Sequence, residues 1–324
     1  MNIAELRGPI LRDVSRSFFL SIRILPRSVR DPVALAYLLA RATDTIADTS
    51  EIGVAERLDA LPALSAAISG GDARAIVGVL RDSFAPRQAN RSERSLILAV
   101  PDLLQWLDSL DEADGTDIRA VLATITRGQF LDLQRFGDTT RIVALNTAAE
   151  LDEYAYLVAG CVGEFWTRIC SRHVRNFSRR AINEMTALGI AYGKGLQLIN
   201  ILRDVGADLR AGRCYLPADE LSVSPTELRD APEAADSVLR HWLAKAGKGL
   251  RDGIEYAAAL NPVRIRIATA LPALIGLRTI ELMQQAGARA IREHIKVSRG
   301  EVRSLALRAI ASCASPRFLD RYKK

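Results

Sequence analysis

Long hydrophobic runs are missing from this chain of 324 residues. No stretch reaches the roughly 18 uninterrupted apolar residues that a membrane-spanning helix needs. The most apolar segment, residues 265–283, is interrupted by charged side chains and by Pro272. The first residues mix charges with short apolar side chains, which is not the pattern of a signal peptide. We therefore expect a cytoplasmic protein that is soluble or peripheral to a membrane.

Cysteine, histidine and aromatic residues are also scarce. The four cysteines form no CxxC pair, and a chain of this size needs no disulfide staples, so a reduced cytosol is the default. The three histidines are far apart in sequence, and we expect no metal site built on histidine. Aromatic residues make up only 6% of the chain. We find no convincing run of alternating strands, whereas long segments show helical periodicity, which predicts an all-α protein.

The charge balance is modest and evenly spread. The chain has 44 basic and 38 acidic residues, an excess of six positive charges. Such a balance suits anionic substrates or peripheral contact with an anionic membrane surface, for example during product release. Arginines are scattered along helical faces with no basic block, so nucleic acid is not an expected partner. Nothing marks a strong domain boundary, and we expect one domain over residues 1–324.

Capping and glycine signals predict where several helices begin and bend. Asp31 is placed to cap a helix with Pro32 in its first turn, and that helix runs to about residue 48. Another is expected to start at residues 115–117 and stop near residue 137. Residues 147–172 form a helix in which Gly160 and Gly163 indicate a kink or the close approach of another backbone or a ligand.

The second half of the chain gives similar signals. A long helix is expected over residues 181–209, followed by a loop over residues 210–221. The sequence Ser224-Pro225-Thr226-Glu227 has the pattern of a capping box at a helix start. Further helices are expected to about residue 258, from 262 to about 286, and after residue 298.

Two spaced carboxylate motifs are the most informative feature of the chain. Asp44 and Asp48 lie four residues apart, as do Asp204 and Asp208, and residues at this spacing share a helix face. Two such helices facing each other would hold Mg²⁺ through oxygen ligands, with a substrate's phosphates completing the shell. Mn²⁺ could replace it. An isolated DxxxD is usually a solvated helix face, but these two extend apolar helices, which favours a metal site.

Other polar residues accompany these motifs. Gln197 and Asn200 precede Asp204 at helical spacing and extend its face. Guanidinium groups match phosphate geometry and stay charged, so together the nearby arginines suggest clamps for a leaving diphosphate, although any one of them could pair with an acidic neighbour. Flanking serines could donate to the same group or serve as local caps. These candidate residues are Ser15, Arg16, Ser17, Arg41, Arg203 and Arg213.

Tyr154 begins a segment of aromatic and small residues, YAYLVAG. Considered alone, this segment favours a structural tyrosine. Small residues near a phenol can also leave room for a substrate chain.

Four segments in order carry a resemblance to a known family. They are Ser15–Phe18 (SRSF), Tyr37–Asp48 with the first aspartate motif, Tyr154–Gly163 (YAYLVAGCVG), and Gln197–Pro217 with the second aspartate motif and the loop after it. Over roughly residues 15–307 the chain resembles the squalene/phytoene synthases, which join two prenyl diphosphates head to head. Each segment is modest alone, but four in the right order are specific.

The resemblance implies a single-domain, all-α isoprenoid synthase fold with helices around a central apolar cavity. It implies that the four aspartates hold Mg²⁺ and that Tyr154 lies near the reacting carbons. Diphosphate would be held by Arg16, Tyr37, Arg41, Arg203 and Arg213, supported by Ser15, Ser17, Gln197 and Asn200.

The resemblance leaves the product open. The run YLLARATDT and the segment KVSRG lean towards squalene synthases, which condense two farnesyl diphosphates through presqualene diphosphate and reduce the product with NADPH. Residues 200–217 look closer to the phytoene type, which needs no reductant. We predict squalene synthesis, with phytoene or dehydrosqualene synthesis as the alternative. A chain-elongating prenyltransferase or cyclase ranks low because the first motif is DTIAD and not DDxxD, and a non-catalytic scaffold relative ranks low because all four aspartates are present.

Overall fold

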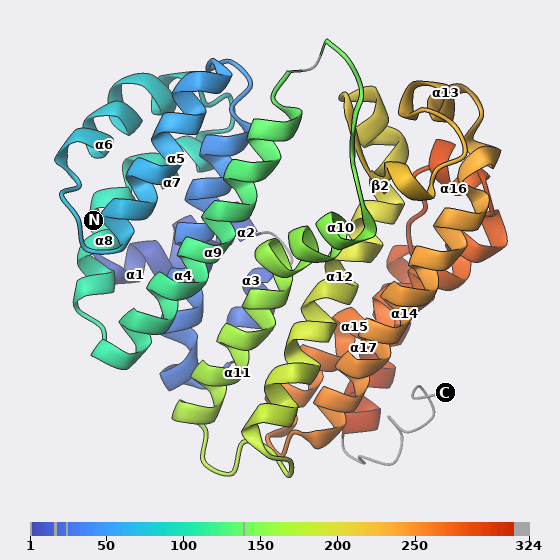
Figure 1. The fold of residues 1–324 in the computed structure, drawn as a ribbon. Helices are drawn as coiled ribbons and strands as arrows, with labels where there is room; N and C mark the ends of the chain where they lie inside the picture. The colour runs from blue at the N-terminus through green and yellow to red at the C-terminus, as the bar shows by residue number, and fades with distance from the viewer. Residues whose placement is uncertain (1, 16–17, 24, 139, 314–324) are drawn as a thin grey trace. The chain divides into compact units, whose positions relative to one another are not determined.

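The computed structural model describes residues 2–15, 18–23, 25–138 and 140–313. These residues are almost entirely helical, with two short strands, which confirms the all-α prediction (Figure 1). The chain divides into two compact units, which we call unit 1 (residues 1–137 and 168–175) and unit 2 (residues 138–167 and 176–324). The expectation of one domain over residues 1–324 stays a prediction, as does the central cavity.

Unit 1 is organised around helix α4, whose apolar side is completely buried. Helices α5, α8 and α9 pack against it. Three segments of unit 1 have π or 3-10 geometry: η1 (Leu6–Ile10), η2 (Leu80–Phe84) and η3 (Ala85–Arg87). The α-helices are α1 (Ile3–Glu5), α2 (Leu11–Ser15), α3 (Phe18–Arg23), α4 (Arg27–Asp48), α5 (Val54–Ile68), α6 (Arg74–Val79), α7 (Arg91–Leu98), α8 (Val100–Asp108) and α9 (Glu112–Phe136).

The predicted start of α4 at Asp31 and Pro32 is wrong. The helix begins four residues earlier, at Arg27, and Pro32 lies inside it. Asp31 lies within the helix and so cannot cap its start, and its carboxylate is paired instead with Arg7, whose Nη1 lies 2.9 Å from Oδ1 of Asp31. The predicted end at Asp48 is confirmed.

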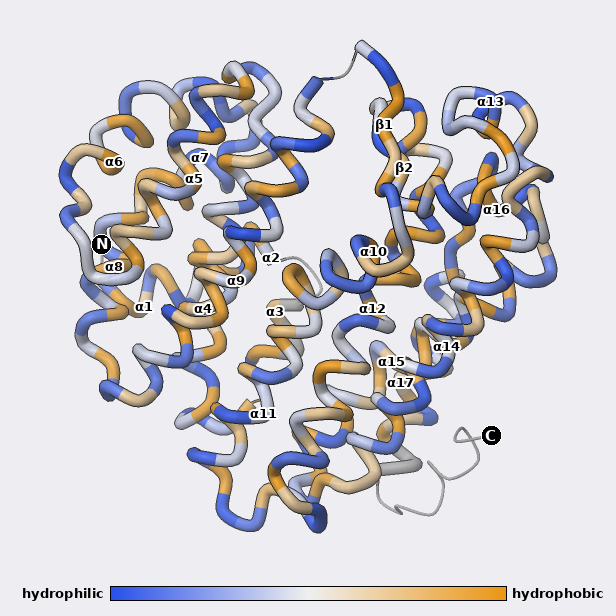
Figure 2. Tube along the Cα trace, in the orientation of Figure 1, coloured by the Kyte–Doolittle hydropathy of each residue, from blue (hydrophilic) through white to orange (hydrophobic). Residues whose placement is uncertain are grey.

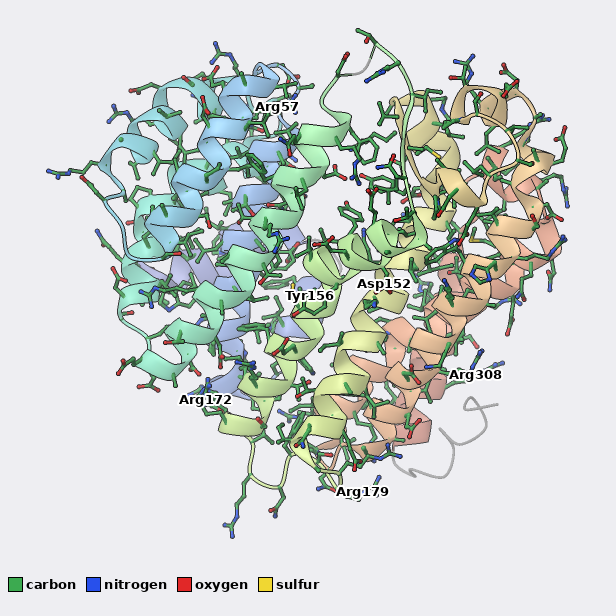
Figure 3. The ribbon with its side chains drawn as sticks, viewed as in Figure 1. Arg57, Asp152, Tyr156, Arg172, Arg179 and Arg308 are labelled. Carbon is green, nitrogen blue, oxygen red and sulfur yellow. The ribbon has the colours of Figure 1, made fainter. Side chains whose placement is uncertain are left out.

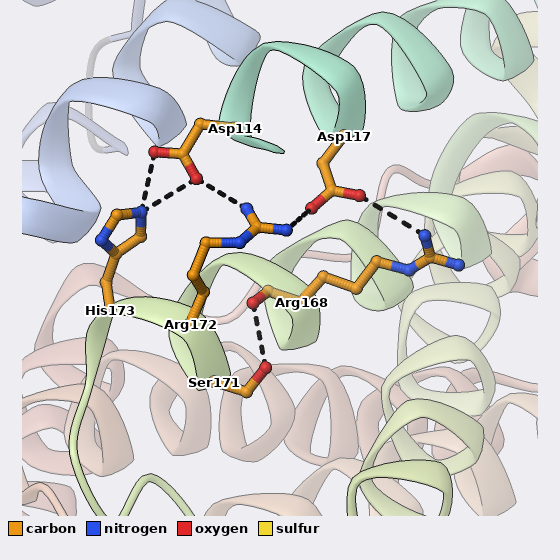
Figure 4. Close-up of polar contacts among 6 residues, drawn as sticks. All are labelled: Asp114, Asp117, Arg168, Ser171, Arg172 and His173. Carbon is orange, nitrogen blue, oxygen red and sulfur yellow. Dashed lines mark hydrogen bonds and ion pairs between the residues drawn. The ribbon is translucent and has the colours of Figure 1, made fainter. Parts of the chain in front are cut away.

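The predicted start of α9 at residues 115–117 is also wrong, since the helix begins at Glu112. Asp114 and Asp117 are buried within its first two turns (Figure 4). Nη1 of Arg172 lies 2.6 Å from Oδ1 of Asp114, and its Nη2 lies 2.5 Å from Oδ2 of Asp117. Nε2 of His173 is 2.7 Å from Oδ2 of Asp114. Asp114 and Asp117 therefore form ion pairs with Arg172 and His173, and neither marks the start of the helix.

Replacing Asp114 by asparagine should destabilise the protein by about 2 kcal/mol, because it removes the buried charge that faces Arg172 and His173. We scale the loss down from that of a fully buried pair because 34% of the Arg172 side chain is exposed. Urea unfolding would measure it. Asp108→Asn is the matched control, since Asp108 is exposed and pairs with Arg119. Equal stability of the two variants would contradict a structural role for the cluster.

Unit 2 is organised around the long helix α12. Helix α14 packs along α12, α15 packs on α14, and α17 packs on α15. Hydrophobic and hydrophilic residues alternate along these helices, as amphipathic packing requires (Figure 2). Helix α11 (Cys161–His173) belongs to unit 2 up to Thr167 and to unit 1 from Arg168 on. The other elements are β1 (Val143–Leu145), α10 (Ala148–Ala155), η4 (Tyr156–Gly160), α12 (Ile182–Arg210), β2 (Arg213–Pro217), η5 (Ala218–Glu220), α13 (Pro225–Asp230), η6 (Pro232–Ala235), α14 (Asp236–Ala259), α15 (Val263–Ala286), α16 (Arg289–Arg292) and α17 (Arg299–Cys313).

The helical stretch with interior glycines approaches α12 very closely. Residues 148–173 are helical throughout, with a π turn at η4. A Cβ added to Gly163 would lie 1.9 Å from the backbone oxygen of Gly189 on α12. No side chain fits between the two backbones at this point. The predicted close approach of another backbone is therefore confirmed.

The prediction of a loop over residues 210–221 is wrong in part. Residues of β2 pair in parallel with β1, with Val143 opposite Arg213. The paired strands are too short, and too far apart in sequence, to show an alternation of apolar and polar residues.

The capping box at Ser224 is confirmed, since the backbone nitrogen of Glu227 donates to Oγ of Ser224 and the backbone nitrogen of Ser224 donates to Oε2 of Glu227. Among the helices that the structure describes, none combines the length and the apolar composition of a membrane-spanning segment.

Candidate functional site

The first aspartate motif lies at the carboxyl end of α4 in unit 1. Asp44 is partly buried and Asp48 is exposed. Arg41, one turn before Asp44, forms an ion pair with it. The other terminal nitrogen of Arg41 lies 2.5 Å from Oε1 of Glu93 on α7. Arg41 is thus held between two carboxylates, and a phosphate would have to compete with them for its donors.

The two carboxylates of this motif repel each other. The pKa of Asp44 is raised to about 6, first by burial and then by the negative charge of Asp48. The ion pair with Arg41 opposes this rise. A divalent cation between two neighbouring carboxylates would neutralise both charges and relieve their repulsion. The donor chemistry of this pair therefore fits a hard cation such as Mg²⁺.

The elevated pKa of Asp44 predicts that divalent-cation affinity depends on pH. The carboxylate must be ionised to bind metal, so affinity should fall as the pH drops through about 6. The effect of Asp44 on the stability of the fold runs the other way. Below about pH 4 the carboxyl group is protonated in both the folded and the unfolded chain and has no such effect. As the pH rises towards 6, ionisation in the unfolded chain is easier than in the folded one, so the fold is destabilised. Titration with Mn²⁺ on either side of pH 6 would test the binding effect. Asp44→Asn should remove this pH dependence. Equal wild-type affinity at both pH values would contradict it.

Two other predicted residues of unit 1, Tyr37 and Ser15, donate hydrogen bonds to backbone carbonyl groups. The Tyr37 hydroxyl donates to the carbonyl oxygen of Val14 over 3.4 Å. Ser15 is buried, and its hydroxyl donates to the carbonyl of Leu11, 2.5 Å away and four residues earlier. That bond fits the local alternative for Ser15 better than phosphate binding. Arg16 and Ser17 lie outside the described residues, and their roles stay predictions.

The second aspartate motif lies on the last turns of α12 in unit 2. Asp204 accepts two hydrogen bonds from Arg203, Nε to Oδ1 at 3.0 Å and Nη2 to Oδ2 at 2.7 Å. Nδ1 of His294 lies 3.1 Å from the same Oδ1. One turn later, Oδ1 of Asp208 lies 3.8 Å from Nε of Arg213. Gln197 and Asn200 lie on the preceding turns of the same helix, as predicted.

Local backbone geometry brings Arg213 back to α12. Gly212 has a φ of +81°, a conformation that glycine adopts without strain. The chain therefore reverses directly after α12 and enters β2, whose first residue is Arg213. The prediction that Arg213 belongs with the second aspartate motif is confirmed as a contact, while its role in binding stays a prediction.

Tyr154 lies on α10 and stacks against an aromatic residue of β2. Its ring centroid is 5.0 Å from that of Tyr215, with 23° between the ring planes. Nearby, Nζ of Lys194 on α12 lies 2.5 Å from Oδ1 of Asp152 on α10. Figure 3 shows Asp152 and Tyr156 along the α10–η4 segment, and the Tyr156 hydroxyl donates to Glu164 over 3.3 Å. This segment is thus bound to both α12 and β2.

Sequence reasoning missed the partners that come from distant segments. Glu93 belongs to no motif found in the sequence, and His294 is one of three histidines that lie far apart along the chain. Tyr215 and Lys194 showed no motif of their own. Each contact is made in three dimensions with a residue on another element. In the part of the chain that the structure describes, no group of three or more His, Cys, Asp or Glu side chains is placed to hold a metal. The four aspartates of the two motifs are divided between the units, with Asp44 and Asp48 in unit 1 and Asp204 and Asp208 in unit 2.

Comparison with known proteins decides the family. The model of the squalene/phytoene synthase family matches residues 11–301, which include every described candidate residue. The chain belongs to this family. The predicted resemblance is therefore confirmed.

Relatives of both product types are similar to this family member. It is 26% identical to a probable squalene synthase of Neurospora crassa over 292 residues, which are 89% of this chain and 58% of that protein. It is 28% identical to a chloroplastic phytoene synthase of Zea mays over 265 residues, 78% of this chain and 53% of that protein. The chain thus spans little more than half the length of these relatives.

Solved structures show the same fold. A ligand complex of TcSQS matches with a TM-score of 0.76 and 23% identity, covering 98% of this chain and 90% of that one. A dehydrosqualene synthase solved with a ligand matches with a TM-score of 0.62 and 21% identity, covering 96% of both chains. At these identities the likeness shows the fold, and it agrees with the predicted isoprenoid synthase architecture.

Proposed function

We propose that this family member condenses two farnesyl diphosphates head to head in a Mg²⁺-dependent reaction. The product of the first step is presqualene diphosphate, which is ionised, rearranged and reduced by NADPH to squalene. The observation that carries the proposal is the family match over residues 11–301, within which both carboxylate pairs and their arginines are present. The prenyltransferase class follows from the family, and the squalene product from the sequence segments that lean that way.

In this proposal Asp44 and Asp48 in unit 1, and Asp204 and Asp208 in unit 2, hold Mg²⁺ through carboxylate oxygens. Bound Mg²⁺ would neutralise the diphosphate as it leaves. Arg41, Arg203 and Arg213 donate to the diphosphate oxygens in the proposed complex and stabilise the charge that develops there, with Tyr37, Gln197 and Asn200 in support.

The carbon chemistry must take place away from water. Departure of the first diphosphate leaves an allylic cation, which the double bond of the second substrate attacks. Loss of a proton closes the cyclopropane of presqualene diphosphate, and a second ionisation opens it. Water would quench either cation, so an apolar surrounding is required. Tyr154, held against Tyr215, is the residue we assign beside the reacting carbons.

The second candidate function is synthesis of dehydrosqualene or phytoene, in which the final cation loses a proton and no reductant is used. Similarity to the Zea mays phytoene synthase and to the dehydrosqualene synthase structure favours keeping it. Incubation with farnesyl or geranylgeranyl diphosphate and Mg²⁺, with and without NADPH, followed by mass spectrometry, separates the two. Squalene that forms only with NADPH supports the first. Dehydrosqualene from farnesyl diphosphate even when NADPH is present, or phytoene from geranylgeranyl diphosphate, would move the protein to the second.

Replacing Tyr154 by phenylalanine should lower kcat by about tenfold and change KM little, because the ring still stacks on Tyr215 while the hydroxyl is lost. Steady-state kinetics with farnesyl diphosphate would measure both constants. Tyr156→Phe, two residues later, is the matched control. Unchanged rates for Tyr154→Phe would reduce Tyr154 to a packing residue.

A further inference from the structure

The residues assigned to metal and those assigned to diphosphate are bound to each other. Arg203 makes a two-pronged contact with Asp204, using Nε and Nη2 for the two carboxylate oxygens. His294 adds a contact to Oδ1 from the segment after α16. Each oxygen of Asp204 therefore already has at least one partner, and two of the donors of Arg203 are used.

The same kind of pairing recurs at Asp208 and at Asp44. Asp208 lies beside Arg213 at the start of β2. In unit 1, Asp44 is paired with Arg41 one turn earlier on the same helix. Asp44, Asp204 and Asp208, all predicted metal ligands, thus each contact a predicted diphosphate ligand. Of the three pairs, Arg203 with Asp204 has the most complete geometry, since two hydrogen bonds join the same two groups.

These ion pairs set a condition on binding. A divalent cation that approaches Asp204 meets a guanidinium only about 3 Å from the carboxylate, and the two positive charges repel. A diphosphate that approaches Arg203 meets donors already given to a carboxylate, together with the negative charge of that carboxylate. A cation that binds alone would leave the Arg203 guanidinium without its carboxylate, and a diphosphate that binds alone would leave the Asp204 carboxylate without its guanidinium. When both arrive, the cation takes the carboxylate and the diphosphate takes the guanidinium.

We propose that Arg203 exchanges partners when substrate binds, moving from Asp204 to the diphosphate as a divalent cation takes its place on the carboxylate. The cation and the diphosphate then bind cooperatively, and free diphosphate is bound poorly without metal. This inference rests on the proposed function, because it assigns the same residues to the same two ligands. It adds that Asp204 restrains Arg203 until metal is present.

The exchange predicts a gain of binding from the loss of a metal ligand. In EDTA, Asp204→Asn should bind inorganic pyrophosphate about tenfold more tightly than the wild type, a factor typical of coupled sites. In Mg²⁺, the same variant should bind it more weakly than the wild type. Isothermal titration calorimetry on the full chain would measure both, with circular dichroism to verify folding.

A double-mutant cycle separates release of Arg203 from a general change of charge. In the Arg203→Gln background, Asp204→Asn should give no gain in EDTA, because the released guanidinium is gone. Asp252→Asn is the matched control: it has the same charge change in the same unit, breaks a pair with Lys248, and lies outside the motif. It should leave pyrophosphate affinity unchanged.

The outcomes distinguish the exchange from the proposed function. If the wild type binds pyrophosphate with Mg²⁺ but Asp204→Asn shows no gain in EDTA, the exchange is overturned and the proposed function stands. A gain that persists in the Arg203→Gln background also overturns it. If the wild type does not bind pyrophosphate even with Mg²⁺, the proposed function fails together with the exchange.

Discussion

Asp48→Asn is expected to lower Mg²⁺-dependent turnover of farnesyl diphosphate by about 10²–10³-fold, the usual cost of removing one electrostatic stabiliser from a reacting site. Asp48 is exposed at the end of α4, so asparagine should fit without disturbing the helix. The loss is expected because the proposed cation would keep only one carboxylate of the pair. Comparison of kcat/KM for the variant and the wild type at saturating Mg²⁺ would measure it.

A charge-matched control shows whether that loss is local. Asp59→Asn removes the same charge from an exposed position on α5 in the same unit and should leave turnover unchanged. Thermal unfolding should show both variants folded. Near-normal activity of Asp48→Asn would contradict the assignment of the first aspartate motif to metal binding, regardless of the activity of Asp59→Asn.

Gly163→Ala is expected to cost at least about 3 kcal/mol of stability, the upper end of the usual range for overpacking. The added methyl group would lie 1.9 Å from the backbone oxygen of Gly189, so α11 and α12 would have to separate. Backbone cannot rotate aside as a flexible side chain can. Urea unfolding would give the free energy. The same displacement should reduce activity, because α12 carries the second aspartate motif and α11 continues the helical segment that carries Tyr154.

The matched control is Gly78→Ala on α6, where an added Cβ meets nothing within 4 Å. Alanine has the higher helix propensity, so this variant should be as stable as the wild type or more stable by up to about 1 kcal/mol. If Gly163→Ala is equally well tolerated, the close approach of α11 to α12 is not the tight contact described above.

The features that were predicted from sequence are local ones. The end of α4, the capping box at Ser224 and the close approach at Gly163 each depend on spacing within one segment or on a single residue type. The aspartate motifs belong here too, because a spacing of four on a helix fixes a shared face. Their assignment to Mg²⁺ remains a prediction that rests on donor chemistry and family.

The features that were missed depend on partners distant in sequence. Asp31 is a residue type that often caps helices, but here it lies inside α4 and pairs with Arg7, a partner 24 residues away in sequence. Residues 115–117 have the composition of a helix start, but the helix begins at Glu112, and Asp117 pairs with Arg172, more than fifty residues later. The β1–β2 pairing and the contact of His294 with Asp204 have the same origin. No periodicity within one segment encodes such pairs.

The most direct test of this account is to measure pyrophosphate release from farnesyl diphosphate by the purified full chain, with Mg²⁺ and with EDTA. The proposed reaction predicts release that requires Mg²⁺, together with squalene in the extract when NADPH is present. Release that is unaffected by EDTA would contradict the assignment of the aspartates to metal. No release from either farnesyl or geranylgeranyl diphosphate would contradict the proposed activity and return the non-catalytic scaffold as the better explanation.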